Sequence, residues 1–259
     1  MLKYLLVGSV LITSAMPGPV YAQLPLTAAL DNPTTRLSVQ ERCTEAPIDV
    51  TAASANERHL ACDAANNALQ LLARCNIFPR RALRIEMSGE VRRPFGGAVV
   101  GLFDPIKGKI LVTQYENVAS LVSGTAFSEL PQRDFYKSLI VHEVVHGVMH
   151  QNYKRQPESH AAYEYPAYAL QIESLPSSVR DKFLQTVNTG ADKREIVFSD
   201  FVLSFDPFFF AARAYEHFRG SANGCAHLLA LIEGDVAFIW TWPLSRKRLL
   251  LVLDHVFPA

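Results

Sequence analysis

The sequence carries no excess charge of either sign, because 25 lysines and arginines balance 25 aspartates and glutamates among 259 residues. A nucleic-acid partner needs a basic patch or stripe, and no stretch of this chain gathers enough lysine and arginine to make one. Internal repeats and low-complexity runs are also missing. These absences exclude nucleic acid as a partner and leave a folded globular protein of one large domain or two small lobes.

Long apolar runs are lacking after the first residues. Residues 4–16 are apolar, follow a short basic start and are broken by Pro17, so they are too short to span a bilayer comfortably. Small residues up to Ala22 stand where a signal peptidase reads. We therefore expect 1–22 to be a secretory signal peptide, with an uncleaved anchor as the alternative. Residues 23–259 would be the mature exported domain, periplasmic or secreted, without membrane contact.

Cysteines are few and include no Cys-x-x-Cys pair, which argues against a four-cysteine zinc site. An even number in an exported chain predicts two disulfides among Cys43, Cys62, Cys75 and Cys225. Cys62 and Cys75 would lie about 20 Å apart along one helix, whereas a disulfide needs Cα atoms within about 7 Å. This leaves Cys43 with Cys75 and Cys62 with Cys225, or Cys43 with Cys62 and Cys75 with Cys225. We favour the first pairing, because a strand leading into the helix would place Cys43 near the helix's far end.

Apolar spacing and turn residues predict an α+β fold. A small mixed sheet with an edge hairpin would form a lobe at about 43–127, and a helical lobe would follow at about 128–259. The predicted strands are 45–51, 82–88, 98–103 and 109–114, the last two forming the hairpin. The predicted helices are 54–74, one from Ser128 or Asp134 to about His150, 160–175, 177–188, 207–219 and 222–233. Residues 236–257 are apolar and ambiguous.

Residues 139–150 read LIVHEVVHGVMH and place three histidines four residues apart. On a helix such residues share a face, so His142 and His146 can present their imidazoles to one point, as a zinc ion at about 2.0–2.1 Å requires. Glu143 is rotated by about 100° and can instead hold and deprotonate a water beside the metal. The flanking residues are apolar, and buried charged groups are costly unless paired or bound to a metal. We interpret His150, one turn further, as an ordinary histidine near the helix end.

Through HEVVH the sequence resembles the zincin metallopeptidases, and also uncharacterised exported bacterial proteins of peptidase character. The predicted order of mixed sheet, edge strand, motif helix and second helix matches the zincin order over about 85–175. Asn152 stands where one zincin branch has a third histidine, so the gluzincin branch is the better likeness. That resemblance implies a zincin-like fold and a third metal ligand on the next helix. It assigns this ligand to Glu164, which lies 18 residues after the second histidine of the motif. The same predicted helix also carries Tyr168 and Gln171.

Two further assignments follow from the resemblance, each with alternatives. The reserves for the third ligand are Glu173 and His160. Peptide hydrolysis also needs a donor for the developing oxyanion, for which the resemblance points to a downstream tyrosine or histidine and we choose His217. The other candidates for that donor are Arg213, Tyr215, Tyr165 and Tyr168.

We therefore expect an exported zinc-dependent hydrolase, a peptidase acting on a peptide or protein substrate. Zn²⁺ would be held by His142, His146 and Glu164, and Glu143 would be the general base. The hairpin at 98–114 would offer an edge strand with which an extended peptide could pair. The alternatives are a non-catalytic exported zinc-binding or structural protein on a zincin scaffold, and a metal-free helical protein in which the motif arose by chance.

Overall fold

The chain divides by its contacts into two units, Met1–Thr35 and Arg36–Ala259, and every residue described below belongs to the second. The predicted signal peptide at 1–22 and all but the first residue of the ambiguous stretch 236–257 lie outside the described residues. The structure is a computed structural model that describes residues 39–44, 46–93, 96–189, 198–221 and 224–236.

A five-stranded mixed sheet forms one layer of this unit, in the order β1-β2-β3-β7-β6. The three central strands run parallel, and β1 and β6 are antiparallel edge strands. Burial alternates along β2 and β3, as it does in strands that pack one side chain in two against a core. The sheet strands are β1 (Val39–Arg42), β2 (Ile48–Ala52), β3 (Leu83–Ser88), β6 (Gly101–Asp104) and β7 (Lys109–Thr113), and a separate ribbon pairs β4 (Val91–Arg92) with β5 (Ala98–Val99).

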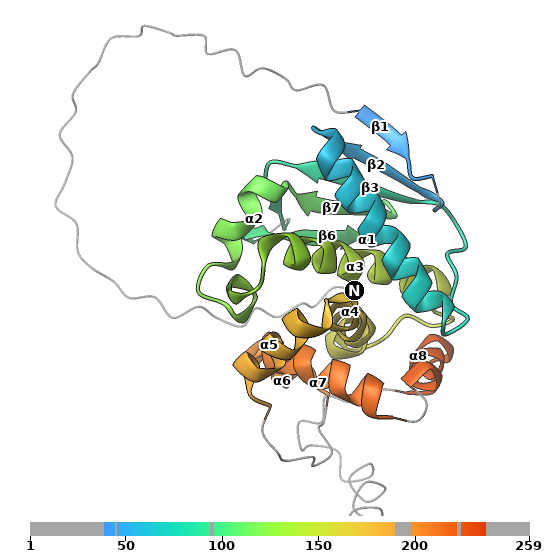
Figure 1. Cartoon of the computed structure of the whole chain (residues 1–259). Helices are drawn as coiled ribbons and strands as arrows, with labels where there is room; N and C mark the ends of the chain where they lie inside the picture. Colours follow the sequence, from blue (N-terminus) through green and yellow to red (C-terminus); the bar gives the residue numbers. More distant parts are fainter. Residues whose placement is uncertain (1–38, 45, 94–95, 190–197, 222–223, 237–259) are drawn as a thin grey trace, which may run out of the picture. The chain divides into compact units, whose positions relative to one another are not determined.

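Helices pack on the sheet and build further layers beyond it (Figure 1). The first helix, α1, connects the parallel strands β2 and β3, and it packs against β2 and α3. Helix α3 contacts β6, β7 and α1 and is covered by α4, which is covered in turn by α7. The helices are α1 (Ala55–Ala73), α2 (Tyr115–Val122), the 3₁₀ helix η1 (Ala126–Glu129), α3 (Gln132–Asn152), α4 (His160–Ser174), α5 (Ser177–Val187), α6 (Asp200–Phe205), α7 (Pro207–Gly220) and α8 (Gly224–Glu233).

The central helix α3 is buried on nearly all sides. Every residue from Ser138 to Met149 is buried. Close packing against the sheet needs a glycine at position 147, because a Cβ on Gly147 would lie 2.9 Å from Cδ2 of Leu83. A helix that is apolar all round is expected between two layers of a protein. The two histidines and the glutamate of the motif therefore lie in the interior.

The predicted α+β class and the predicted order of strands and helices are confirmed. The structure adds β1, β4, α2, η1 and α6, which the sequence did not predict, and it divides the predicted strand 98–103 into β5 and β6. Pro166 is the seventh residue of α4, deeper in the helix than the first turn, where proline is tolerated best. Packing of α4 between α3 and α7 supports the helix across this proline.

The favoured disulfide pairing is wrong, and the second pairing is present: Cys43 bonds Cys62, and Cys75 bonds Cys225. A strand rises about 3.3 Å per residue and a helix about 1.5 Å, so the five residues of β2 are matched by about eleven residues of α1. Cys43, whose amide bonds the carbonyl of Ile48 at the start of β2, therefore lies beside the middle of α1, close to Cys62, and not beside its far end.

Two disulfides fit an oxidising environment, as expected of an exported protein. Within the described ranges, no helix combines the length and the apolar character that a membrane span requires.

Candidate metal site

Two histidines of α3 and one glutamate of α4 converge in the interior. Nε2 of His142 and Nε2 of His146 lie 3.0 Å apart, and Oε2 of Glu164 lies 3.2 Å from the first and 3.4 Å from the second. Tetrahedral zinc with bonds of about 2.0–2.1 Å places its ligand atoms about 3.3 Å apart. The three atoms form a triangle of nearly that size, so this group could hold a metal ion.

Helical periodicity explains why these side chains meet. His142 and His146 are four residues apart on α3, so they share one face. On α4, Glu164, Tyr168 and Gln171 follow at intervals of four and three and share the face turned toward α3. Tyr168 and Gln171 contact the first histidine, and Glu164 contacts both, so the two helices run in opposite directions at the site.

The charges of the group are set by its burial and by its own ion pairs. Burial lowers the pKa of His142, but the hydrogen bond and negative charge of Glu164 more than offset this, so that pKa lies above its ordinary value. Burial raises the pKa of Glu164, and the two imidazoles outweigh it and hold the pKa well below its usual range. Glu164 is therefore a carboxylate near neutral pH, the form that binds a metal.

Glu143 lies beside the metal group but is not part of its triangle. It is next to His142 in sequence and rotated by about 100° around α3, which turns it toward the edge strand β6. A Cβ on Gly101 of β6 would lie 2.7 Å from Oε1 of Glu143, so the strand's backbone closely approaches the carboxylate. Burial raises the pKa of Glu143, and the charges of His142 and His146 oppose that shift. The arrangement places a carboxylate between the metal group and the edge strand.

Aromatic rings enclose the two imidazoles. The ring of Tyr163 stacks on His146 with centroids 4.6 Å apart and an interplanar angle of 13°, and Tyr168 meets His142 edge-on at 4.7 Å. His142, Glu143 and His146 are 7%, 5% and 4% exposed, respectively. The candidate metal site is thus largely shielded from water, which strengthens electrostatic interactions inside it.

The reserve ligands occupy different places. His160 is exposed at the start of α4, with Nε2 3.6 Å from Oε1 of Glu164, so it borders the group without joining it. The carboxylate of Glu173 lies instead 3.5 Å from Arg219 and 3.9 Å from Arg74. Among the described residues, the three-ligand group is the one formed with Glu164.

His217 lies in another cluster of side chains. Its Nδ1 is 2.6 Å from the hydroxyl oxygen of Tyr165, and its ring also contacts His227. Tyr165 follows Glu164 in sequence, but it faces α7 rather than α3. Two other candidates for the oxyanion donor are engaged elsewhere, since Arg213 pairs with Glu216 and Tyr215 lies under a guanidinium group. Of the candidates for that donor, Tyr168 is the one that contacts the metal group.

The third histidine of the motif helix, His150, lies apart from the metal group as well. Its ring packs at 5.4 Å against Phe103 of β6.

Two residues at the site were not singled out from the sequence. Nothing in the spacing marks Tyr163, whereas Gly101 carries a usable signal, because a glycine inside a strand often marks a close approach of backbone to another group.

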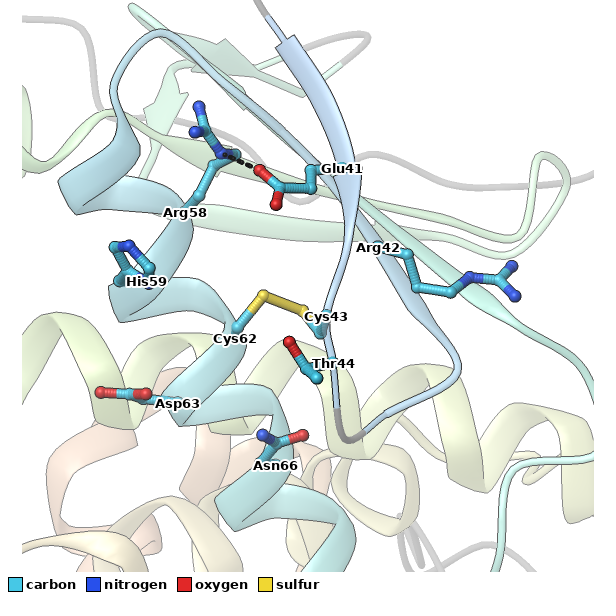
Figure 2. A pocket seen from close by; sticks show the side chains of 9 residues that line it. All are labelled: Glu41, Arg42, Cys43, Thr44, Arg58, His59, Cys62, Asp63 and Asn66. Carbon is cyan, nitrogen blue, oxygen red and sulfur yellow. Dashed lines mark hydrogen bonds and ion pairs between the residues drawn. A yellow bond between two sulfur atoms is a disulfide. The ribbon is translucent and has the colours of Figure 1, made fainter.

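A hollow on the other side of α1 is unconnected with these residues. It has a volume of about 240 Å³ and lies next to the Cys43–Cys62 disulfide, where Glu41 pairs with Arg58 (Figure 2). Its lining mixes charges of both signs and contains no member of the metal group; the lining residues are Glu41, Arg42, Cys43, Thr44, Arg58, His59, Cys62, Asp63 and Asn66.

Residues 48–241 match a family described as a family of unknown function, DUF6639. The chain belongs to this family. The matched range includes α3 and α4 with the whole metal group and Glu143, whereas Cys43 lies outside it. Neither the search of curated proteins nor that of solved structures found a match.

Proposed function

We propose that this member of the DUF6639 family is an exported zinc-dependent hydrolase, and that it acts as a peptidase. The observation that carries the proposal is the triangle of Nε2, Nε2 and Oε2 atoms, with edges of 3.0, 3.2 and 3.4 Å. Imidazole nitrogens and a carboxylate oxygen are the donors that catalytic zinc sites use when three protein ligands leave a fourth position open. The resemblance of HEVVH to the zincin motif supports zinc over other metals.

In this proposal a bound zinc ion would polarise the scissile carbonyl and make a water easier to deprotonate. Glu143 accepts the proton of the attacking water at Oε1 or Oε2, while the water oxygen forms its bond to the carbonyl carbon. Glu143 then gives that proton to the amine nitrogen as the carbon–nitrogen bond breaks. The position of Glu143 suits this role, because the carboxylate is next to the metal group without belonging to it.

Substrate would lie along the edge strand β6, next to Glu143. One edge of β6 pairs with β7, and β6 is the last strand of the sheet on the other side. An extended peptide can add to such an edge through main-chain hydrogen bonds that do not depend on its side chains. Export to the periplasm or the medium is supported by the two disulfides and by the signal-like residues 1–22.

The test compares zinc content with hydrolysis of a peptide library in three forms of the mature protein. Glu143→Gln should keep about one zinc per chain and lose hydrolysis, whereas His146→Ala should lose the zinc. Glu129→Gln is the matched control, because this exposed glutamate pairs with Lys182 away from the site, and it should keep both properties.

The outcomes separate the proposed function from its rivals. Full hydrolysis by zinc-loaded Glu143→Gln would refute the mechanism. Zinc without any hydrolysis in the parent protein would favour the non-catalytic zinc-binding protein. A parent that binds no zinc would support the metal-free alternative.

A further inference from the structure

The buried side chain of Gln171 connects the metal group to the backbone of α3. It is 2% exposed, and its Oε1 lies 2.9 Å from Nδ1 of His142. Its Nε2 lies 3.5 Å from the hydroxyl oxygen of Ser138, which is itself 2.8 Å from the carbonyl oxygen of Phe135. Three hydrogen bonds in series therefore run from a backbone carbonyl to the first histidine of the motif.

The direction of each hydrogen bond in this series follows from its neighbour. The carbonyl oxygen of Phe135 can only accept, so the Ser138 hydroxyl donates its single hydrogen there. The Ser138 oxygen then accepts the next bond, which requires the NH₂ group of Gln171 on that side. The oxygen of the Gln171 amide consequently faces His142 and can only accept, so Nδ1 of His142 must carry a hydrogen.

This assignment fixes the chemistry of the opposite ring nitrogen. A neutral imidazole with its hydrogen on Nδ1 has its lone pair on Nε2. Nε2 of His142 is the atom that faces Nε2 of His146 and Oε2 of Glu164. The series of hydrogen bonds thus selects the tautomer in which the metal-facing nitrogen can bind a cation.

The two histidines are held by different means. Nδ1 of His146 is buried and has no hydrogen-bond partner among the described residues. The stacked ring of Tyr163 restrains His146 by contact instead. A hydrogen bond therefore sets the tautomer of His142 alone.

We propose that Gln171 is a positioning residue for the metal site: through the series Phe135–Ser138–Gln171 it holds His142 in the tautomer that binds metal through Nε2. The inference rests on the zinc binding that the proposed function requires, and it does not depend on what the enzyme cleaves. Partners that orient metal-binding histidines are typically worth about 10–100-fold in metal affinity. Gln171 accepts the hydrogen bond of Nδ1 with a neutral amide oxygen. A carboxylate in its place would make Nε2 of the imidazole a stronger electron-pair donor to the metal.

The test measures the affinity of the metal-free mature protein for zinc alone, in competition with a chelator. Gln171→Leu keeps the approximate volume but removes the acceptor, and it should weaken zinc binding by about 10–100-fold. Gln171→Glu restores an acceptor at the same place and should bind zinc at least as tightly as the parent. Gln132→Leu is the matched control. The side-chain amide of Gln132, at the start of α3, donates to the carbonyl of Tyr115 and not to a metal ligand, so this variant should bind zinc as tightly as the parent.

A second measurement separates the tautomer from general damage to the fold. In ¹⁵N NMR of the metal-free parent, at a pH at which His142 is neutral, the hydrogen should lie on Nδ1, and Gln171→Glu should show the same signature, whereas folded Gln171→Leu should not. Equal zinc affinity in the parent and in folded Gln171→Leu would overturn the inference while leaving the hydrolase proposal intact. A loss in Gln171→Glu as large as in Gln171→Leu would also overturn it, because the acceptor would then be irrelevant. A parent that binds no zinc would refute the proposed function, and this inference with it.

Discussion

Replacement of Gly101 by alanine tests whether the position of Glu143 matters for catalysis. The added Cβ would lie 2.7 Å from Oε1, 2.9 Å from Cγ and 3.0 Å from Cδ of Glu143. Ordinary van der Waals contact begins at 3.4 Å, so Oε1 must move by at least 3.4 − 2.7 = 0.7 Å. Because the atoms in the way belong to one side chain, the carboxylate should shift and the fold should persist, at a cost of about 1–3 kcal/mol for overpacking.

A displacement of that size is large for catalysis. Misplacing a catalytic group by about 1 Å can cost about 10²-fold in rate, so Gly101→Ala should lose about that much in kcat. The zinc content should stay at that of the parent, because the three atoms nearest to the added Cβ all belong to Glu143 and none to a metal ligand. The assay is elemental analysis beside hydrolysis of a peptide library by the same preparations.

Gly97→Ala is the matched control for this substitution. Gly97 lies in the same segment, and a Cβ there would meet nothing within 4 Å, so both zinc content and rate should be unchanged. Hydrolysis at the parental rate by Gly101→Ala would refute the reasoning. Loss of zinc from Gly101→Ala would refute it as well, since the disturbance would then have reached the ligands.

Two further predictions concern stability. A disulfide stabilises the fold by restricting the unfolded chain, and the effect grows with the length of the loop that it closes. Removing Cys75–Cys225, with a separation of 150 residues, should therefore lower the free energy of unfolding by about 5 kcal/mol, and removing Cys43–Cys62, with a separation of 19, by about 3 kcal/mol. Chemical denaturation of the two double-alanine variants measures both losses, and equal losses would contradict this argument. Burial, aided by the charge of His217, lowers the pKa of His227 from 6.5 to about 4. On acidification the unfolded chain therefore binds a proton at His227 before the folded protein does. The stability that comes from keeping His227 neutral is complete above pH 6.5 and is lost as the pH falls toward about 4. His227→Gln should flatten the fall of the melting temperature over that interval, and an unchanged slope would contradict the assignment.

Most of the helices and strands could be predicted from patterns within short stretches of the sequence. Periodicity and turn residues located α1, α3 and α4 to within a few residues, because each helix has to bury a face that is visible in the sequence. The short elements β1 and α6 were missed, since so few residues carry little periodic signal. The disulfides depend on how far α1 extends past β2, and that length ratio was misjudged.

The candidate site was predictable only in part, for a physical reason. The spacing of His142 and His146 is a property of one helix, so the sequence contains it. The approach of Glu164 depends on how α4 packs on α3, and the prediction of that residue came from the resemblance to zincins. Contacts such as that of Tyr163 with His146, or of Gly101 with Glu143, join separate elements, and no spacing within one element encodes them.

The central claim is that His142, His146 and Glu164 form one metal site, and zinc content per chain tests it most directly. Elemental analysis of the mature protein should give about one zinc, and much less in Glu164→Ala. Glu173→Ala, on the same helix but paired with arginines, should keep the zinc of the parent. No zinc in the parent after reconstitution would contradict the account, and full zinc in Glu164→Ala would remove Glu164 from the site.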